Sequence, residues 1–415
     1  MILAIDVGGT KMAAALVGPD GVPRRITRVA TPQHADAQTL WKTLTDLIDP
    51  LSGGVAGVGV GCGGPMTWPD GEVSPLNIPA WRGFPLRARL AARFPGLPVR
   101  IHNDAVCVAV AEHWQGAGRG SADMLGMVVS TGVGGGLILG GRLINGGTGN
   151  AGHIGHVVVE PEGGPRCGCG GHGCLEAVAR GPALTEWALS QGWTPSSTAT
   201  LNRPLTETPD RETPGRRSTG RETPGRGSTG REAAGRGSTG REAAGRGSAG
   251  REAAGLRGDG RAVAGPGIGD PCVAGPGIAN LGAAGVGAAG VGAAGVVAVG
   301  AVGVEPYRED RAVTGRALAA DARAGVEVAV AAMRRAGRAL GIAIASATHL
   351  CDLDLVTIGG GLSQAGEPLF GPLEEALREH ARMDFARRVR VVPAALGQEA
   401  GLVGAAALIL AGESY

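Results

Sequence analysis

Apolar runs joined by glycine turns mark two parts of the chain. Residues 2–7 are apolar, and a second apolar run, MAAALV, follows the turn sequence DVGGTK. The same order recurs where MLGMVVS at 124–130 and the apolar LIL enclose a glycine-rich stretch at 131–136. Short apolar runs bounded by turn residues are typical of buried β-strands. The two strand–turn–strand units therefore predict two related halves that face a cleft.

The spacing of apolar residues also predicts helices. Residues 36–51 place leucines and an isoleucine on one helical face, and this pattern stops before Pro50. The apolar runs VRIH and LDLVTI predict two further strands, and alternating strands and helices indicate an α/β fold. Further helices are predicted at 105–114, 181–191, 316–347 and 368–380, with GLVGAAALIL as a terminal helix.

Low-complexity sequence separates these regions. Residues 211–260 form five ten-residue blocks, each of which begins with RETPG or REAAG. They offer no apolar face, so nothing offsets the entropy lost on ordering the backbone, roughly 1–2 kcal/mol per residue. The uncharged stretch 281–304 is long enough to span a bilayer, but eight of its 24 residues are glycine. We therefore predict a disordered insertion at 198–312 and no membrane span.

Charge and cysteine usage narrow the class of protein. The chain has 415 residues, which is enough for two domains, and a net charge of +2. Thirteen Arg and eight acidic residues lie from Arg203 to Arg261, so the rest of the chain carries −3 and shows no nucleic-acid footprint. Met1 leads directly into ILAIDV without a basic patch, so we expect no secretory signal. Seven cysteines, an odd number, fit a reducing compartment, and we expect a cytoplasmic protein.

A cysteine cluster follows the second strand–turn–strand unit. Cys167, Cys169 and Cys174 form a C-x-C-x4-C run, and His156 precedes it. Three thiolates and one imidazole are a standard closed ligand set for structural zinc. His172 lies inside the run and could replace His156 as the fourth ligand. The alternative is a flexible loop with three unpaired thiols, but crowded cysteines in an intracellular chain favour a metal.

Two carboxylates stand at strand ends. Asp6 could hold magnesium through water, and Thr10 in the next turn could bind a phosphate. A lone D-x-G-G-T is also compatible with a plain hairpin turn. Asp104 lies between the strand VRIH and a helix, where α/β enzymes place catalytic groups. The alternative role for Asp104 is a helix N-cap.

These motifs resemble one family. GHIGH followed by CGCGGHGCLE is similar to the signature of the ROK sugar kinases, within the actin-like ATPase superfamily, and DVGGTK and the Asn103–Asp104 pair agree with it. The resemblance implies two ribonuclease-H-like α/β domains around a cleft. The predicted division is an N-terminal domain at 1–117, a C-terminal domain with the zinc loop at 118–197 and 313–400, the insertion at 198–312, and a terminal helix at 401–415 that packs on the first domain.

The resemblance also implies roles for individual residues. Asp104 would be the catalytic base, and zinc would be bound by His156, Cys167, Cys169 and Cys174. The sugar would be bound by Asn77, Asn103, Asp104, His153, His156 and Glu176, whereas Trp81 is as well explained as a core aromatic. ATP and Mg²⁺ would be bound by Asp6, Gly8, Gly9, Thr10, Lys11, Thr131, Gly132, Gly134, Gly135, Gly360 and Gly361.

Two positions depart from the family pattern. His153 stands where G-E-x-G-H has its glutamate, and Val106 replaces the last Asn of N-D-A-N. We expect an ATP-dependent kinase that phosphorylates the 6-hydroxyl of glucose, with N-acetylglucosamine or N-acetylmannosamine as the alternative sugars. A non-catalytic sugar sensor is the alternative class. A repressor is not expected, because the first strand starts at Ile2 and leaves no room for a helix-turn-helix. The expected partners are sugar and ATP, without nucleic acid or membrane, and the expected assembly is a homodimer or homotetramer.

Overall fold

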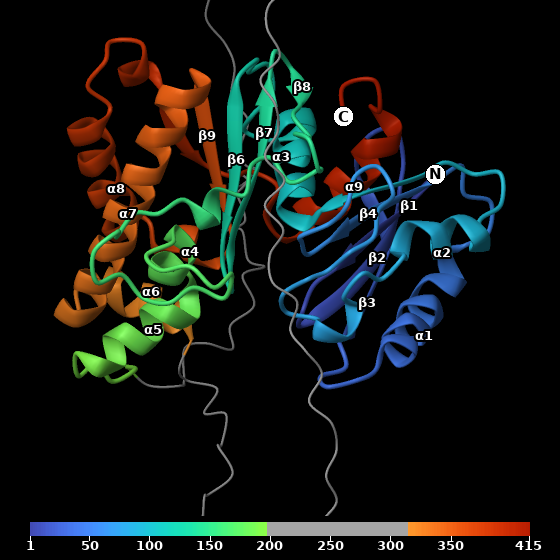
Figure 1. Ribbon diagram of the computed structural model, residues 1–415, viewed down its shortest axis with the longest axis horizontal. Helices are drawn as coiled ribbons and strands as arrows, with labels where there is room; N and C mark the ends of the chain where they lie inside the picture. Colours follow the sequence, from blue (N-terminus) through green and yellow to red (C-terminus); the bar gives the residue numbers. More distant parts are fainter. Residues whose placement is uncertain (197–313) are drawn as a thin grey trace, which may run out of the picture. The chain divides into compact units, whose positions relative to one another are not determined.

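The computed structural model describes residues 1–196 and 314–415 of the chain, which contain two sheets of the same design (Figure 1). The first sheet has the order β3-β2-β1-β4-β5, in which β2 is antiparallel to both β1 and β3, while β1, β4 and β5 are parallel. Its strands are β1 (Ile2–Val7), β2 (Lys11–Val17), β3 (Pro23–Ala30), β4 (Val58–Cys62) and β5 (Val99–Asn103).

The second sheet repeats this design in the order β10-β9-β6-β7-β8. Its first three strands in sequence form antiparallel pairs, and β9 and β10 add in parallel to β6. The predicted fold class, two α/β domains of the actin-like ATPase type, is confirmed. The strands are β6 (Met124–Val129), β7 (Val133–Leu139), β8 (Arg142–Leu143), β9 (Leu355–Gly359) and β10 (Arg390–Pro393).

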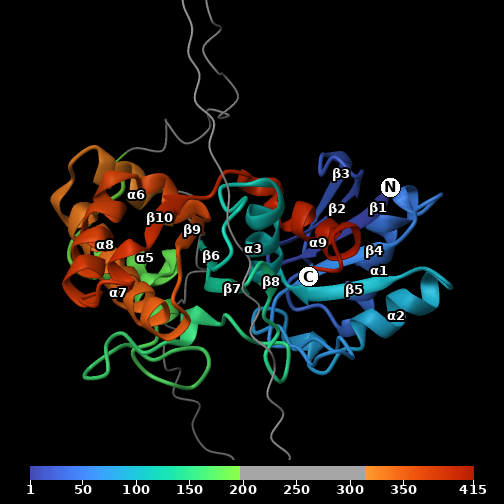
Figure 2. The same cartoon turned by 90° about the horizontal axis from the view of Figure 1, so that it is seen from above.

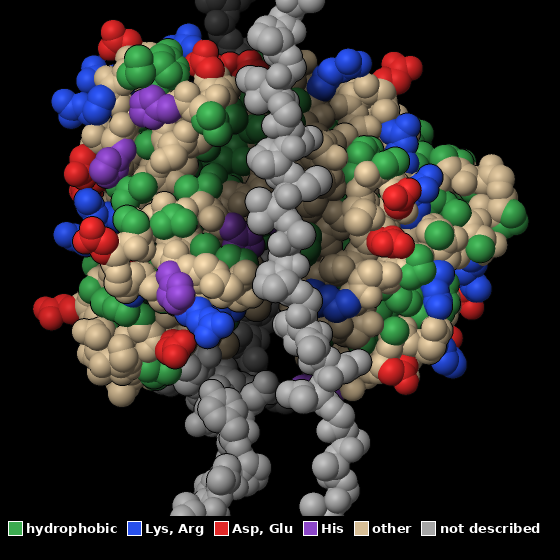
Figure 3. Space-filling model, viewed as in Figure 1, with side chains coloured by type: hydrophobic (Ala, Val, Ile, Leu, Met, Phe, Trp, Pro, Cys, Tyr) green, Lys and Arg blue, Asp and Glu red, His purple; other side chains and the backbone are tan. Residues whose placement is uncertain are grey.

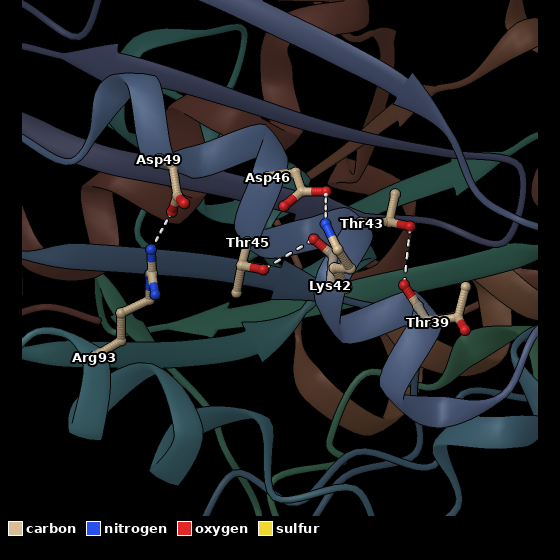
Figure 4. A network of polar contacts seen from close by, with 7 residues as sticks. All are labelled: Thr39, Lys42, Thr43, Thr45, Asp46, Asp49 and Arg93. Carbon is tan, nitrogen blue, oxygen red and sulfur yellow. Dashed lines mark hydrogen bonds and ion pairs between the residues drawn. The ribbon is translucent and has the colours of Figure 1, made fainter.

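Helices α1 (Ala37–Ile48) and α2 (Leu86–Arg93) share a core with one face of the first sheet. The predicted apolar face of α1 is buried, and its N-cap Asp36 accepts a hydrogen bond from the Thr39 amide (2.7 Å). An ion pair between Arg93 and Asp49 joins the end of α2 to the end of α1, and a Lys42–Asp46 pair (2.7 Å) lies along the exposed side of α1 (Figure 4). These exposed pairs contribute little to stability, so burial of the apolar face holds α1 in place.

Helices α3 (Asp104–Gln115) and α9 (Ala400–Leu410) lie side by side (Figure 2) and share one core with both sheets. Helix α9 packs mainly on β1 and β4, and α3 packs mainly on β6 and β7. The helices approach so closely that a Cβ on Gly404 would lie 1.7 Å from the Cys107 carbonyl oxygen. Because α3 contacts both sheets, the boundary at residue 117 remains a prediction, as do the other predicted boundaries.

A buried carboxylate also joins these helices. Glu112 on α3 is fully buried and accepts hydrogen bonds from three backbone amides. The donors are Ala117, just after α3 (2.8 Å), and Ala395 and Leu396, just before α9 (3.0 and 2.9 Å). Satisfied by three donors, this carboxylate fixes the end of α3 against the segment that leads into α9.

The other face of the second sheet is covered by helices that form one large core. They are α4 (Leu175–Ala179), α5 (Gly181–Ser190), α6 (Gly315–Arg323), α7 (Glu327–Cys351) and α8 (Glu367–His380). The helical region predicted at 316–347 is present, as two helices rather than one continuous helix. It is divided between α6 and α7 at Gly325, whose φ of +85° is a left-handed helix stop that the alanine-rich periodicity concealed.

Hydrogen bonds hold the residues just before the gap at 197–313 against the helix that follows it. Asp321 on α6 is buried, and its Oδ2 accepts hydrogen bonds from Trp193 Nε1 (2.9 Å) and the Ser196 amide (3.1 Å). Thr314 caps the same helix by accepting from the Ala317 amide. The chain therefore leaves and re-enters the described fold at α6.

Several predictions concern residues outside the described ranges. The disordered insertion at 198–312 and the apolar stretch 281–304 fall in this class. Among residues 1–196 and 314–415, no helix is both long and apolar enough to cross a membrane. On the face shown in Figure 3, basic and acidic side chains are interspersed rather than gathered by sign.

Candidate active site

The turn between β1 and β2 is held from behind by residues that follow β3. Thr31 Oγ1 donates to the Gly8 carbonyl (2.7 Å), and Gln33 Nε2 donates to the Gly9 carbonyl (2.9 Å). A Cβ on Gly9 would lie 2.6 Å from Asn77 Nδ2, so a larger residue at position 9 would displace the Asn77 side chain. A tight turn whose carbonyls are engaged in this way suits phosphate binding by its amides. Of the predicted residues, Asp6 lies in β1, Gly8, Gly9 and Thr10 form the turn, and Lys11 begins β2.

Asp104 is the first residue of α3, and Asn103 fixes where that helix begins. Asn103 Oδ1 accepts hydrogen bonds from the amides of Ala105 (2.9 Å) and Val106 (3.4 Å), which makes Asn103 the N-cap. Asp104 is therefore not the N-cap, although its Oδ1 also accepts from the Ala105 amide (2.8 Å). The cap uses the oxygen of Asn103 and leaves its amide nitrogen for other contacts.

Asp6 and Asp104 are both carboxylates whose pKa is raised by burial. Burial, followed by the negative charge of Asp104, raises the pKa of Asp6 from 3.8 to about 7, and Lys11 opposes this rise. Burial also raises the pKa of Asp104, against the hydrogen bond from the Ala105 amide, and Glu176 adds to the rise. A carboxylate with a raised pKa is a stronger base when it is ionised, which suits proton abstraction.

Asn103 and His153 meet over Gly64. A Cβ built on Gly64 would lie 2.8 Å from Asn103 Nδ2 and 3.2 Å from His153 Nε2. Burial lowers the pKa of His153, and neighbouring His156 adds to this effect, so the imidazole is neutral near pH 7. The charge of Glu176 acts on both His153 and Asp104, which places all these groups in one neighbourhood.

Glu176 links this neighbourhood to the second glycine turn. It lies in α4, two residues after Cys174, and its Oε2 accepts a hydrogen bond from the Val133 amide (2.9 Å). A Cβ on Gly132 would lie 2.9 Å from the same oxygen. One carboxylate oxygen is thus committed to the turn, and the other can serve a ligand.

The second glycine turn is shorter than the sequence predicts. Thr131 and Gly132 lie in the turn, whereas Gly134 and Gly135 lie within β7 and pair with β6. A Cβ on Gly134 would lie 2.6 Å from the Cβ of Ala105, because α3 packs directly on this strand. The predicted loop at 131–136 was therefore wrong in extent, and close packing of α3 explains Gly134.

The third glycine loop lies at the end of β9. Gly360 has a φ of +93°, and a Cβ there would lie 2.3 Å from the Val129 carbonyl oxygen, so this position requires glycine. Gly361 begins the 3₁₀ turn Gly361–Ala365. The Ser130 carbonyl, next to the second turn, accepts a hydrogen bond from the Gly181 amide (2.8 Å). A Cβ on Gly181 would in turn contact Leu362, which follows the third loop. The second and third loops therefore meet at the carboxyl ends of β6 and β9.

The four predicted metal ligands come together. The ligand atoms of His156, Cys167, Cys169 and Cys174 all lie within 4.8 Å of one another. Cys167 Sγ is 3.6 Å from His156 Nδ1, and Cys169 Sγ is 3.7 Å from Cys174 Sγ. Tetrahedral zinc, with bonds of about 2.3 Å to sulfur and about 2.0 Å to nitrogen, separates its ligands by about 3.5–3.8 Å. The set therefore fits zinc, and His172 is exposed and outside this group.

Backbone hydrogen bonds shape the cysteine loop. The Gly173 carbonyl accepts from the amides of Val159 (2.8 Å) and Glu160 (3.1 Å), and Gly173 has a φ of +68°. A Cβ on Gly173 would lie 1.8 Å from the Glu160 carbonyl oxygen, so no other residue fits. Glu160 also pairs with Arg335 on α7 (2.9 Å), which anchors the loop to the helical layer.

Sequence reasoning missed three polar residues near this site. His102 Nε2 lies 2.8 Å from Asn145 Oδ1, and the Asn150 side chain bonds both the amide and the carbonyl of Met66 (3.1 and 2.8 Å). These contacts join segments far apart in the sequence, so periodicity could not reveal them. The only local signal was the position of His102 directly before Asn103. Trp81 is fully buried and stacks on Phe84, as a core aromatic should.

Comparison with known proteins gives a consistent family. A sequence model of the ROK family matches residues 2–207 and 287–411. An N-acetylmannosamine kinase from Escherichia fergusonii is 41% identical over 193 residues, which are 46% of this chain and 64% of that protein. The aligned part of the chain thus spans somewhat less than two thirds of this curated relative.

Two solved structures of sugar kinases are similar to this chain. A ROK family glucokinase from Streptomyces griseus, in complex with glucose and AMPPNP, has a TM-score of 0.64, 27% identity and 98% coverage of both chains. A ROK hexokinase from Thermus thermophilus has a TM-score of 0.60 and 26% identity, covering 98% of this chain and 96% of its own.

We expect purified protein to hold one zinc ion per chain at the cysteine cluster. Cys169→Ser should lower both the zinc content and the melting temperature, because structural zinc contributes roughly 10–16 kcal/mol of binding free energy in small peptides. Cys351→Ser, which alters a cysteine on α7 outside this cluster, is the matched control. Zinc-free wild-type protein, or unchanged zinc and melting temperature in Cys169→Ser, would contradict the assignment.

Asp6→Asn should stabilise magnesium-free protein at pH 8 by a few degrees and stabilise it clearly less near pH 5. The pKa of Asp6 is higher in the fold, about 7, than its ordinary 3.8. The folded state therefore binds this proton more tightly, and the resulting stability is fully present below about pH 3.8, declines as pH rises above 3.8 and is lost once pH passes about 7. Melting temperatures at the two pH values test this, with the exposed Asp70→Asn as control. Equal shifts at both pH values, or destabilisation at pH 8, would refute it.

Proposed function

This chain belongs to the ROK family, and on that premise we propose that it is an ATP-dependent sugar kinase. It would transfer the γ-phosphate of ATP to a hexose hydroxyl, which by family resemblance is the 6-hydroxyl. The observation that carries the proposal is the grouping of Asn103, Asp104, His153 and Glu176 beside Asp6 and the first glycine turn. Phosphoryl transfer to a sugar hydroxyl requires a base, neutral polar groups and phosphate-binding turns close to one another.

Asp104 is the proposed general base. It stands at the first position of α3, and its raised pKa strengthens the ionised carboxylate as a proton acceptor. It would accept the proton of the sugar hydroxyl as that oxygen attacks the γ-phosphorus, and such a base contributes roughly 10²–10⁴-fold to the rate. The rest of the rate enhancement would come from positioning and electrostatics.

Asp6 is the proposed magnesium-side residue. A divalent cation would bind favourably to this buried carboxylate, since the cation offsets the burial and the repulsion from Asp104 that together raise the pKa of Asp6. Magnesium bound there through water would neutralise charge on the phosphates of ATP. The backbone turns at Gly8–Thr10 and Thr131–Gly132 would position these phosphates, and Gly360–Gly361 would line the adenosine side.

Zinc is proposed to act on the architecture of the sugar site rather than on the chemistry. His156 and Cys174 are ligands at the two ends of the cluster, and Glu176 follows Cys174 by two residues. A closed four-ligand site would hold these ends together. It would thereby fix Glu176, and the His153 ring that lies 6.2 Å from His156 between ring centroids.

The proposed substrate is an N-acetylhexosamine, with N-acetylmannosamine first and glucose second. The sequence expectation placed glucose first, and two observations support reversing this order. A curated N-acetylmannosamine kinase is 41% identical over 46% of this chain. His153 replaces the glutamate of the family pattern, and a neutral imidazole does not repel the carbonyl oxygen of an acetamido group as a carboxylate would.

Asp104→Asn should abolish turnover while leaving sugar affinity nearly unchanged, because the amide keeps the shape and loses the basicity. We expect kcat to fall at least about 100-fold. A coupled assay of ADP release measures turnover, and calorimetry measures sugar binding. A kcat above about a tenth of the wild-type value would remove Asp104 from the base role. Sugar binding without turnover in the wild type would favour the sensor alternative.

His153→Glu should shift the ratio of kcat/KM for N-acetylmannosamine to that for glucose at least several-fold towards glucose. The added carboxylate would accept hydroxyl hydrogens and repel the acetamido carbonyl. Wild-type enzyme assayed on glucose, N-acetylglucosamine and N-acetylmannosamine supplies the reference ratios. His172→Glu, at an exposed loop position, is the control for added charge. An unchanged ratio in His153→Glu would mean that position 153 does not read the sugar.

A further inference from the structure

His102 is a buried histidine to which the proposed reaction assigns no role. It is 1% exposed and stands at the carboxyl-side end of β5, directly before Asn103 and Asp104. Its ring makes two hydrogen bonds of 2.8 Å, one with the Asn103 amide at Nδ1 and one with Asn145 Oδ1 at Nε2. The first bond is local, and the second reaches a segment after β8.

The partners fix the state of the ring. A backbone amide can only donate, so Nδ1 of His102 is the acceptor. Nε2 then carries the hydrogen of the neutral ring and donates it to Asn145 Oδ1. Burial lowers the pKa of His102, which agrees with a neutral imidazole. Both bonds thus use the ring in one tautomer, with no capacity left over.

Asn145 opens the short segment 145–152 that leads into His153. The Asn145 carbonyl accepts from the Ala151 amide (3.2 Å), which closes this segment on itself. Asn150 then bonds the backbone of Met66, as described above. The 145–152 segment is therefore attached near one end to β5, through His102, and near the other to the loop after β4, through Met66.

Trp68 completes the contact. Its ring centroid lies 5.5 Å from that of His102, and a Cβ on Gly149 would lie 2.5 Å from the Trp68 Cβ. The loop that carries Met66 and Trp68 therefore packs against both His102 and the 145–152 segment. The bond between His102 and Asn145, named here the His102–Asn145 bridge, lies at the centre of these contacts.

The bridge connects two groups that meet elsewhere. Asn103, next to His102, and His153, next to the 145–152 segment, both approach Gly64, at 2.8 and 3.2 Å from a Cβ built there. Asn103 comes from β5, and His153 comes from the segment after β8. The relative position of Asn103 and His153 depends on the contacts that join these two segments. The His102–Asn145 bridge is one such contact, and it lies next to Asn103 in the sequence.

We propose that His102 is a positioning residue of the sugar site, which through the His102–Asn145 bridge holds Asn103 and His153 in register across Gly64. This inference rests on the proposed function of the site. It predicts that breaking the bridge weakens sugar binding without removing the base. Loss of one neutral hydrogen bond should raise the sugar KM about three- to tenfold, with kcat and the KM for ATP within about twofold of wild type.

Two substitutions separate the bonds of His102. His102→Asn retains a polar atom near the Nδ1 position and loses the bridge, whereas His102→Gln retains a donor near the Nε2 position. We expect His102→Asn to show the raised sugar KM and His102→Gln to lie closer to wild type. A Gln variant as poor as the Asn variant would overturn the proposal. His113→Asn is the matched control, because His113 on α3 also bridges two partners, Tyr415 Oη and the Ser121 carbonyl.

A double-mutant cycle tests the bridge itself. His102→Asn and Asn145→Ala should each raise the sugar KM, and the double variant should be no worse than the poorer single variant. Additive effects, or a fall in kcat at unchanged KM, would overturn the proposal. Melting temperature and zinc content, measured in each variant, identify any general loss of folding.

Amide hydrogen exchange separates this inference from the proposed function. Both single variants should speed exchange in the 145–152 segment without any sugar present, and His113→Asn should not. Wild-type protein that phosphorylates no hexose would refute the kinase proposal, while exchange would still test the bridge. An active kinase whose 145–152 amides exchange at wild-type rates in His102→Asn would refute the bridge alone.

Discussion

The close packing of α3 and α9 between the two sheets is the constraint on which the candidate site depends. Gly404 lets α9 approach the backbone of α3 at Cys107, and Gly134 and Gly136 let α3 lie directly on β7. Glu112 fixes the other end of α3 with three backbone amides. The first residue of α3 is Asp104, and Gly401 near the start of α9 would place a Cβ 2.9 Å from Asp6 Oδ2. Two helices packed at backbone distance thus set the separation of the two carboxylates on which the proposed chemistry relies.

This placement opposes stability. Burial raises the pKa of both Asp6 and Asp104, and the charge of Asp104 adds to the rise at Asp6, so the fold disfavours their ionised forms. A protein selected only for stability would place neutral groups there. Locations where burial and like charge coincide are typical of functional sites, because ligands or cations can offset the repulsion. The apolar core around α3 and α9 offsets the destabilisation caused by burying these two carboxylates.

Much of the fold and part of the site could be predicted from the sequence. Buried strands are visible in the sequence as apolar runs, so β1, β2, β6 and β9 were predicted. The edge strands β3 and β10 carry arginines and were not predicted. Asn103 and Asp104 were recognisable at a strand–helix junction, and the cysteine spacing indicated the metal ligands. The glycines at 134–136 were misread because glycine serves turns and close-packed strands equally. His102, Asn145 and Asn150 were beyond prediction, since their partners are distant in sequence and only the folded chain brings them together.

The hydrogen bonds of Asp321 bear on how this fold accommodates a long connection between α5 and α6. One carboxylate on α6 holds Trp193 and Ser196, and the cap of the same helix is Thr314, so the last residues before the gap and the first after it share one short helix. The cost of closing a loop between neighbouring anchor points rises only with the logarithm of its length. The connection between α5 and α6 can therefore change in length without altering either sheet. Differences in length among proteins of this architecture should concentrate at this connection, because its anchor residues are held by α6 and none of them belongs to the candidate site.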